Sequence, residues 1–380
     1  MISNTNCDKV ISLLIFSIVL DMNSTPNNIY NLPKNFKELL TEKAKSLNLC
    51  ALSIINPSIL SKHTQDFQKI ITGFPLELSY LKKNIDVRNN PNLILPNCKS
   101  ILCTALSYNN DDELLDPRNG HISIYASGRD YHKTLKNKLN ELGKFIKLYI
   151  NTANYRAITD SAPFYEQFAA TYGQICTKGK NGLVRFKDSG SKIFLAELLL
   201  DVCIEESEFC NLYPTNKALK CPPNCKICLN ACPTKALGET FNVNKCISFL
   251  TIENKNTIPI ELRNSIGNNI YGCDACQNAC PNNKNCIIGD DEFRNRYSTN
   301  FLDLNNLLSI TEEEFKKAFA GTPILRIGYI NFIRNVIVAA GNSSNNTISK
   351  NLLLSHKGNN PIINELVEWA LCKLFSIKMK

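Results

Sequence analysis

Two short cysteine runs constrain this chain more than any other feature of its sequence. The first reads Cys221-PPN-Cys225-KI-Cys228-LNA-Cys232-Pro, and the second reads Cys273-DA-Cys276-QNA-Cys280-Pro. Pairs of four-iron–four-sulfur clusters are commonly held by C-x2-C-x2-C-x3-C-P runs, in which the last cysteine ligates the other cluster. The segment that carries these runs is therefore predicted to take its shape from metal ligation more than from a hydrophobic core.

The crossing of the last cysteine gives a specific ligand assignment. The first cluster is predicted to use Cys221, Cys225, Cys228 and Cys280, and the second to use Cys232, Cys273, Cys276 and Cys246, which lies between the runs. A zinc site is the alternative, but four-cysteine zinc sites usually show two separate C-x2-C knuckles without the Cys-Pro ending. The pattern therefore favours two iron–sulfur clusters.

The first run departs from the usual spacing because it begins C-x3-C, with Pro222 where the pattern has a cysteine. We expect Cys221 to reach the iron on a reshaped loop. Replacement by Cys210 or Cys203, or a labile cluster, are the alternatives. The remaining cysteines are interpreted as ordinary buried or free thiols, namely Cys7, Cys50, Cys98, Cys103, Cys176, Cys286 and Cys372.

The wider composition limits the class of protein. The chain has 380 residues, enough for two or three domains, and its 44% hydrophobic content supports sizeable cores. Its seventeen cysteines gather mainly in one region, whereas a secreted disulfide scaffold is short and spreads them along the chain. The formal net charge of +9 is compatible with an anionic partner such as nucleic acid, and equally with solubility alone.

Residues 1–35 are interpreted as an N-terminal extension. Residues 10–20, VISLLIFSIVL, are apolar, but a helix needs about 20 residues to span a bilayer. The residues that follow, DMNSTPNN, do not resemble a signal-peptide cleavage site. We therefore expect a cytoplasmic protein without a membrane segment, for which Met22 is an alternative start.

Three regions follow the extension. Strand-like and helical segments alternate in residues 36–200, among them CALSII, ILCTALSY and YHKTLKNKLNELGKFIKLYI, which predicts an α/β domain. Residues 201–290 form the cysteine-rich module. Residues 291–380 predict short amphipathic helices, including TEEEFKKAFAG and ILRIGYINFIRNVIVAAGN. The predicted fold class is therefore α+β with several domains.

Several longer phrases match one known family. They include YASGRDYHKTL (125–135), TDSAPFYEQFAA (159–170), GSKIFLAE (190–197), KCISFLTIE (245–253), IGNNIYGCDACQNACP (266–281) and FIRNVIVAAGN (332–342). On these phrases the chain resembles epoxyqueuosine reductase, the cobalamin-dependent enzyme of tRNA queuosine synthesis. The match runs from about residue 36 to residue 376. The phrases at 245–253 and 266–281 are highly specific, because a generic ferredoxin has neither.

The resemblance implies a fold, a reaction and partners. Residues 36–200 would form a nitroreductase-like domain that binds cobalamin, residues 201–290 a ferredoxin-like module, and residues 291–380 a HEAT-like region that binds tRNA. The reaction would be the two-electron reduction of epoxyqueuosine to queuosine and water at the wobble base. An external donor of the ferredoxin or flavodoxin type would supply electrons through the clusters to cobalt, and the enzyme would act as a monomer.

The resemblance assigns the proton donor to Asp160, because opening an epoxide makes an alkoxide that a carboxylic acid can protonate. The apolar residues 162–165 are expected to keep this acid protonated. Without the family, Asp160 would be interpreted as a helix N-cap. Besides Asp160 itself, the residues that the resemblance assigns to cofactor contact are Tyr125, Arg129, Lys180, Asn181, Ser248 and Asp274.

In the helical region, Arg326 and Arg334-Asn335 match the family's RNA-facing end, and the alternative for Arg334 and Asn335 is that they brace helices against each other. His132 is interpreted as a helix-face histidine rather than a cobalt ligand. Trp369, the only tryptophan, is interpreted as a core residue. Besides Pro222, the chain departs from the family in the segment GQICTKG (173–179), in Asn282 after the second Cys-Pro, and in a short C-terminus.

Three other interpretations remain open. A reductive dehalogenase-like protein also pairs cobalamin with two clusters, but such enzymes are typically exported, and the chain shows no twin-arginine leader. A two-cluster electron carrier would leave the matched N-terminal region unexplained. A homologue that binds tRNA without turnover is suggested only by the altered spacing at Pro222.

Overall fold

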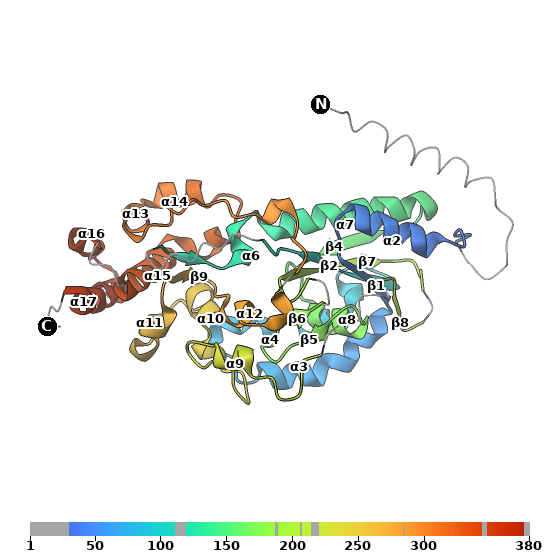
Figure 1. Cartoon of the computed structure of the whole chain (residues 1–380). Coiled ribbons are helices and arrows are strands. Elements are labelled where there is room, and N and C mark those ends of the chain that lie inside the picture. Colours follow the sequence, from blue (N-terminus) through green and yellow to red (C-terminus); the bar gives the residue numbers. More distant parts are fainter. Residues whose placement is uncertain are drawn as a thin grey trace, which may run out of the picture.

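The computed structural model describes residues 30–110, 119–186, 189–205, 207–213, 220–284, 286–343 and 348–375. A β-sheet flanked by helices lies at one end of this part of the chain, and the C-terminal helices lie at the other (Figure 1). The cysteine-rich segment with α9 and α12 lies between these two ends. The apolar run 10–20 and the alternative start Met22 lie outside the described residues.

The sheet has five antiparallel strands in the order β4-β7-β2-β1-β8. Their bounds are β1 Ala51–Ile55, β2 Ser100–Ser107, β4 Tyr155–Ile158, β7 Ile193–Leu200 and β8 Phe209–Asn211. Every residue of the central strands β2 and β7 is buried, which explains why their sequences SILCTALS and IFLAELLL are apolar without alternation. The edge strand β8 extends the sheet past residue 200, where the sequence predicted a domain boundary.

Helices cover both faces of the sheet. On one face α2 (Phe36–Ser46) packs beside α7 (Tyr131–Tyr149), which buries a helical stripe that includes Leu135, Leu139, Leu142 and Ile146. Position 143 of α7 has no room for a side chain, because a Cβ there would lie 2.6 Å from the ring of Tyr155 in β4. The other face packs against α8 (Glu166–Tyr172) and η1 (Pro57–His63).

Short elements connect these layers and carry the cysteine runs. Around the sheet they are α3 Thr64–Ile71, η2 Leu76–Leu78, α4 Tyr80–Lys83, α5 Ile85–Asn89, η3 Pro91–Leu93, β3 His121–Ile122, α6 Ile124–Ser127, β5 Thr177–Lys178 and β6 Val184–Arg185. In the cysteine-rich segment they are α9 Ile227–Asn230, η4 Val243–Lys245, α10 Ile247–Ile252, α11 Ile260–Ile266, β9 Asn269–Tyr271, α12 Ala275–Asn278 and η5 Pro281–Asn283. The small strand β9 pairs in parallel with β3, so the two regions share a backbone ladder.

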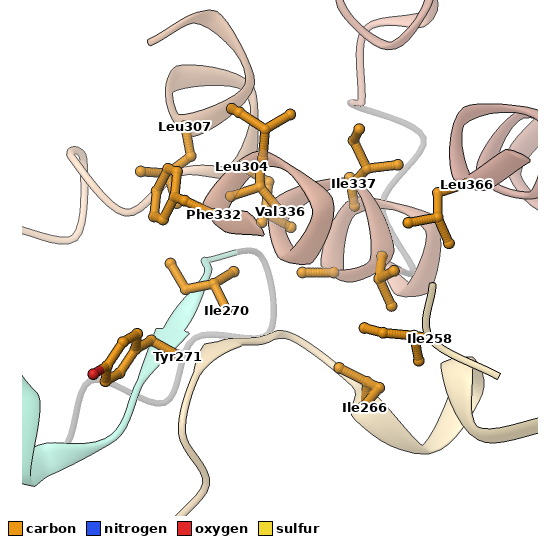
Figure 2. Close-up of a cluster of buried hydrophobic side chains, with 14 of the residues drawn as sticks. Ile258, Ile266, Ile270, Tyr271, Leu304, Leu307, Phe332, Val336, Ile337 and Leu366 are labelled. Atoms are coloured by element: carbon orange, nitrogen blue, oxygen red, sulfur yellow. The ribbon is translucent and has the colours of Figure 1, made fainter. Parts of the chain in front are cut away.

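The C-terminal region is helical and packs around α15 (Gly328–Asn342). Its other elements are η6 Asp291–Phe293, α13 Leu304–Ser309, α14 Glu312–Ala318, η7 Pro323–Ile327, α16 Lys350–Ser355 and α17 Pro361–Phe375. Figure 2 shows Phe332, Val336 and Ile337 of α15 between residues of α13 and α17 and the isoleucines Ile258, Ile266 and Ile270. This core joins the C-terminal helices to the second half of the cysteine-rich segment.

The segment Pro323–Asn342, which contains α15, is long and apolar enough to cross a membrane by length and composition alone. Of its most apolar window, 67% is buried inside the protein, as in the core helix of a globular domain. Trp369 of α17, predicted to be a core residue, is buried against Gly341 of α15, where a Cβ would lie 2.4 Å from its ring.

Arg334 and Asn335 do not face solvent, which decides against RNA contact, the first of the two interpretations of these residues. Their exposed fractions are 1% and 0%. Arg334 donates hydrogen bonds to the carbonyls of Leu250, Asn254 and Asn256 at 2.6–2.9 Å, which satisfies backbone oxygens at the end of α10. The Asn335 amide donates to two more carbonyls, and burial lowers the pKa of Arg334 to about 10. The bracing interpretation is the correct one.

Replacing Arg334 by methionine should leave three buried carbonyls without a donor. We expect Arg334→Met to lower the free energy of unfolding by about 3 kcal/mol, measured by chemical denaturation. Arg294→Met is the control, because Arg294 pairs with Asp291 on the surface and its loss should cost about 0.5 kcal/mol or less. Equal effects of the two substitutions would contradict the bracing role.

Candidate functional site

Asp160 lies on the loop that follows β4, with its side chain turned outward. The backbone of Asp160 has φ 42°, in the left-handed region that aspartate tolerates better than most residues. The preceding Thr159 is buried and donates to the carbonyl of Leu195 in β7 at 2.9 Å, and the amide of Asp160 donates to Glu166 Oε1 at 2.6 Å. These two anchors hold the loop so that the carboxyl group, 64% exposed, points away from the sheet.

The start of α7 supplies the partners of this carboxyl group. The Tyr131 hydroxyl donates to Asp160 Oδ2 at 2.8 Å, and His132 Nε2 lies 3.7 Å from the same oxygen. Asp130 caps α7 by accepting from the His132 amide, and its Oδ1 also lies 2.6 Å from His132 Nδ1. Asp130 therefore fixes the imidazole so that its other nitrogen faces Asp160.

The C-terminal region adds a cation to this group. Arg326, in η7, lies 194 residues after His132 in the chain, and its Nη2 is 2.9 Å from His132 Nδ1. The same nitrogen lies 3.6 Å from Asp130 Oδ2. Arg326 is half exposed, so it joins the group around Asp160 while remaining open to a ligand.

The two cysteine runs meet because α9 packs against α12. Burial, followed by the charges of Cys280, Cys221 and Cys225, raises the pKa of Cys228. Those four thiols are the set that the sequence predicted for the first cluster. Of the alternatives to Cys221, Cys203 lies in the connection between β7 and β8. Cys210 lies in β8 at the edge of the sheet, where it interacts with Lys37 and Glu205.

The second predicted set also gathers. Burial raises the pKa of Cys273 to about 12, with further contributions from Asp274, Cys276 and Cys246. Cys246 in turn interacts with Cys232 of the first run. The interaction of Cys276 with both Cys228 and Cys232 indicates that the two sets are neighbours.

Asp274, between two cysteines of the second run, was predicted to contact the cofactor, and in the structure its side chain is buried against other parts of the chain. It is 2% exposed, and its carboxylate accepts from the Ser123 hydroxyl at 2.5 Å and from the Ile124 amide at 2.9 Å. Its Oδ2 also lies 3.1 Å from His121 Nε2. Both oxygens of Asp274 are thus engaged by the chain, which ties the second cysteine run to the segment around Ser123.

Comparison with known proteins extends over both the sheet and the cysteine runs. The family model "Epoxyqueuosine reductase QueG, DUF1730" matches residues 88–161, and the model "4Fe-4S double cluster binding domain" matches residues 221–283. The epoxyqueuosine reductase of Salmonella typhimurium is 35% identical over 305 residues, which cover 78% of this chain and 77% of that protein. The enzyme of Francisella cf. novicida is 34% identical over 359 residues, covering 88% and 98% of the two chains.

The chain belongs to the epoxyqueuosine reductase family. Among solved structures, the family member from Streptococcus thermophilus has a TM-score of 0.78 and 27% identity, and covers 91% of this chain and 92% of its own. A second has 28% identity and a TM-score of 0.76, covers 90% of each chain, and was solved with an epoxyqueuosine-modified tRNA stem loop. Because the match covers the sheet as well as the cysteine runs, a two-cluster electron carrier does not account for this chain.

The pKa of Asp160 is shifted in the opposite direction from the one predicted. Burial raises the pKa of Asp160, but hydrogen bonds from His132 and Tyr131 and the charge of Arg326 outweigh it, so the pKa is lowered. The neighbours Phe164 and Tyr165 are both buried in the core under the sheet. The prediction that apolar neighbours keep Asp160 protonated is wrong for this state.

The pKa of His132 is shifted upward, opposite to that of Asp160. Burial lowers its pKa, but the bonds to Asp130 and Asp160 raise it more, and the net shift is upward. In the pH range between the lowered pKa of Asp160 and the raised pKa of His132, the pair is therefore an ion pair. His132 belongs to the site, although the sequence pattern alone indicated only a helix face.

Two glutamates near Asp160, the half-buried Glu166 and the buried Glu197, were not predicted as site residues. Burial and the charge of Asp160 raise the pKa of Glu166 to about 7. Glu197, in β7, is fully buried, and neither of its oxygens has a hydrogen-bond partner among the described residues. Burial raises the pKa of Glu197 well above its usual range, which favours the neutral form of this side chain. Its only signal in the sequence is an acidic residue inside the apolar run IFLAELLL.

The remaining predicted contacts fall into two groups. Tyr125 packs near Tyr131, with 6.5 Å between ring centroids, and the exposed Arg129 pairs with Glu292 at 3.4 Å. Ser248 is half-buried in α10. Lys180 and Asn181 instead contact the two cysteine runs, at Cys225 and Cys276.

The hydroxyl of Tyr131 stabilises the ionised form of Asp160, so removing it should raise the pKa of that carboxyl group. We expect this rise in Tyr131→Phe, measured by ¹³C NMR titration of carboxyl-labelled aspartate with Asp160→Asn for assignment. Tyr149→Phe, at the other end of α7, should leave the titration unchanged because Tyr149 packs against Phe36. An unaltered Asp160 titration in Tyr131→Phe would show that this bond does not set the protonation state.

Proposed function

We propose that this chain reduces epoxyqueuosine to queuosine at the wobble position of tRNA, with two four-iron–four-sulfur clusters and cobalamin. The observation that carries the proposal is a single, outward-facing carboxyl group, Asp160, held by Tyr131 and His132 in the same fold as two sets of cysteines. A relative of similar fold was solved with an epoxyqueuosine-modified stem loop. Another was solved with its catalytic aspartate loop swung out of the active site, which supports a carboxyl group on a loop as the reacting acid.

The eight cysteines of the two sets would hold the clusters. Cys221, Cys225, Cys228 and Cys280 would ligate the first cluster, and Cys232, Cys246, Cys273 and Cys276 the second. The mutual interactions of the thiols within each set support this division. Thiolates are the ligands that such clusters require, and the packing of α9 on α12 brings the two cysteine runs together.

Cobalamin is proposed on the chemistry of the surrounding side chains. Arg185 in β6 is 3% exposed, and its Nε and Nη2 have no hydrogen-bond partner among the described residues. Such buried donors fit a ligand rich in acceptor oxygens, as the amides and phosphate of cobalamin are. Tyr125, Arg129, Ser248 and Arg185 would hold it, whereas Asp274 would act only through the backbone it fixes. When bound, cobalamin supplies a strongly reducing cobalt centre for the electron pair.

The reaction consumes two electrons and two protons, because both carbon–oxygen bonds of the epoxide break and the oxygen leaves as water. Asp160 would give a proton to the oxygen as the ring opens. Since its pKa is lowered while that of His132 is raised, the pair would act as one acid. His132, oriented by Asp130, would replace the proton that Asp160 loses.

The other parts of the chain follow from the same proposal. Residues 36–200 would form the nitroreductase-like catalytic domain, 201–290 the ferredoxin-like module, and 291–380 the HEAT-like region that binds tRNA, after the extension 1–35. Arg326 would meet the RNA, because it is half exposed beside the catalytic group. An external donor of the ferredoxin or flavodoxin type would supply electrons to a monomer in the cytoplasm.

Removing one cluster ligand tests the metal assignment. After anaerobic reconstitution, Cys246→Ala should hold about four irons instead of about eight, because only the second cluster loses a ligand. Cys286→Ala is the matched control, since Cys286 lies six residues after Cys280 and donates to the carbonyl of Asn282 at 3.1 Å. A full iron content in Cys246→Ala, or the same loss in Cys286→Ala, would remove Cys246 from the ligand set.

Removing the proposed acid tests the chemistry. We expect Asp160→Asn to reduce epoxyqueuosine in a tRNA stem loop about 10²- to 10⁴-fold more slowly, because an amide cannot donate the required proton. Iron content and stem-loop binding should stay at the parent level.

The exposed Asp86→Asn in α5 is the control for loss of a carboxylate alone. Full activity in Asp160→Asn would require another acid, and Glu166 is the nearest alternative. A parent protein that takes up iron and tRNA but never turns over would support the inactive homologue instead.

A further inference from the structure

The tight turn between β5 and β6 presents two polar side chains to the cysteine runs. The turn is closed by the Gly179 amide, which donates to the Leu183 carbonyl at 2.7 Å, and by the Gly182 amide, which donates to the Gly179 carbonyl at 3.0 Å. Gly182 has φ 80°, a conformation that favours glycine. The resulting geometry holds Lys180 and Asn181 at the tip of a short, well-defined hairpin.

Lys180 reaches across to the loop of the first run. Its ammonium group donates to the carbonyl of Cys225 at 2.9 Å and also to the carbonyl of Pro223. An ammonium group carries three donors on a flexible stem, so one lysine can join two carbonyls of a curved loop. Lys180 therefore binds the segment in which the spacing departs from the usual pattern.

That segment has few internal means of support. Pro222 and Pro223 have no backbone amide, so neither can donate within the loop or to a cluster sulfur. Within the loop, the Cys225 amide donates to the Pro222 carbonyl at 3.1 Å. The loop also contains one residue more than the usual spacing, and each additional free residue increases the entropy that ligation must overcome.

The neighbouring residue of the same turn contacts the second run. The side chain of Asn181 lies near the thiol of Cys276, where it favours the ionised thiolate. The turn thus touches both runs from the catalytic domain, at Cys225 through Lys180 and at Cys276 through Asn181 (Figure 1 shows β5 and β6 beside α9 and α12).

We propose that Lys180 is a positioning residue for the first iron–sulfur cluster, and that it holds the lengthened Cys221–Cys225 loop in the shape that ligates iron. This inference rests on the proposed function, in which these cysteines ligate a cluster. Lys180 donates hydrogen bonds to the loop from outside, whereas Pro222 and Pro223 have no N–H group with which to stabilise the loop from within. Its positive charge beside the cluster also favours the reduced, more negative state, so it raises the reduction potential.

The test compares two lysines that differ in tethering but not in charge. Lys180→Met removes the charge and both hydrogen bonds. Lys226→Met removes a charge next to Cys225 from an exposed side chain that has no hydrogen bond to the loop carbonyls of Pro223 and Cys225. Both proteins and the parent are reconstituted anaerobically, and iron loss to a ferrous chelator and the potentials from a mediated titration followed by EPR are measured.

We expect Lys180→Met to lose half of its iron about tenfold faster than the parent, a change that the loss of charge-assisted hydrogen bonds can produce. The other half, in the second cluster, should be retained, and the potential of the first cluster should become more negative. Lys226→Met should retain its iron like the parent. Lys180→Arg, which keeps charge and donors, should restore most of the retention.

Parent-like iron retention and potentials in Lys180→Met would overturn the inference. The inference would also fail if Lys180→Met kept both clusters but did not take up cobalamin, because Lys180 would then serve the corrin. Failure of the parent itself to bind about eight irons would contradict the proposed function rather than this role of Lys180.

Discussion

The buried carboxylate of Asp274 determines how the parts of this molecule stand relative to one another. It lies between Cys273 and Cys276, and it accepts hydrogen bonds from Ser123 and Ile124 at the start of α6. The same stretch of chain continues into α7, which carries Tyr131 and His132. A carboxylate with 2% exposure is stable only while its donors remain, since an unpaired buried charge costs several kcal/mol. Asp274 therefore ties the cysteine run to the segment that leads into the catalytic helix.

A second polar anchor acts in parallel with Asp274. The amide of Gln277 donates to the Tyr108 hydroxyl at 3.0 Å and to the Ser191 carbonyl at 2.9 Å, and Ser191 also bonds to Asn283. Tyr108 and Ser191 flank the paired strands β2 and β7. The cysteine-rich segment, whose own elements are short, thus takes its orientation from the most regular part of the sheet. Supporting hydrogen bonds of this kind hold the cluster ligands and the catalytic side chains in a fixed geometry, which a site for both electron and proton transfer requires.

The sequence was informative where structure depends on local spacing. The predicted amphipathic helix at 131–150 corresponds to α7, Tyr131–Tyr149, and the predicted strand at 101–108 to β2, Ser100–Ser107. Contacts between distant segments could not be predicted in this way. The sequence left Arg334 open between RNA contact and helix bracing, because a cation on a helix has the same appearance whether it meets phosphate or buried carbonyls. Only the packing of α15 on α10 and β9 decides between them.

Asp160, the acid of the proposed reaction, has a lowered pKa and is therefore ionised near neutral pH. Its surroundings explain how an ionised group can still serve as the proton donor. The protein around Asp160 partly desolvates its carboxyl group, which acts to raise its pKa against the hydrogen bonds of His132 and Tyr131. A substrate that covered the exposed carboxyl group would remove more water and strengthen the upward influence. His132, already holding a proton and oriented by Asp130, would then transfer it across the short gap to Asp160. Asp160 would therefore be protonated only when a substrate covers it, and in the absence of substrate the proton would stay on His132.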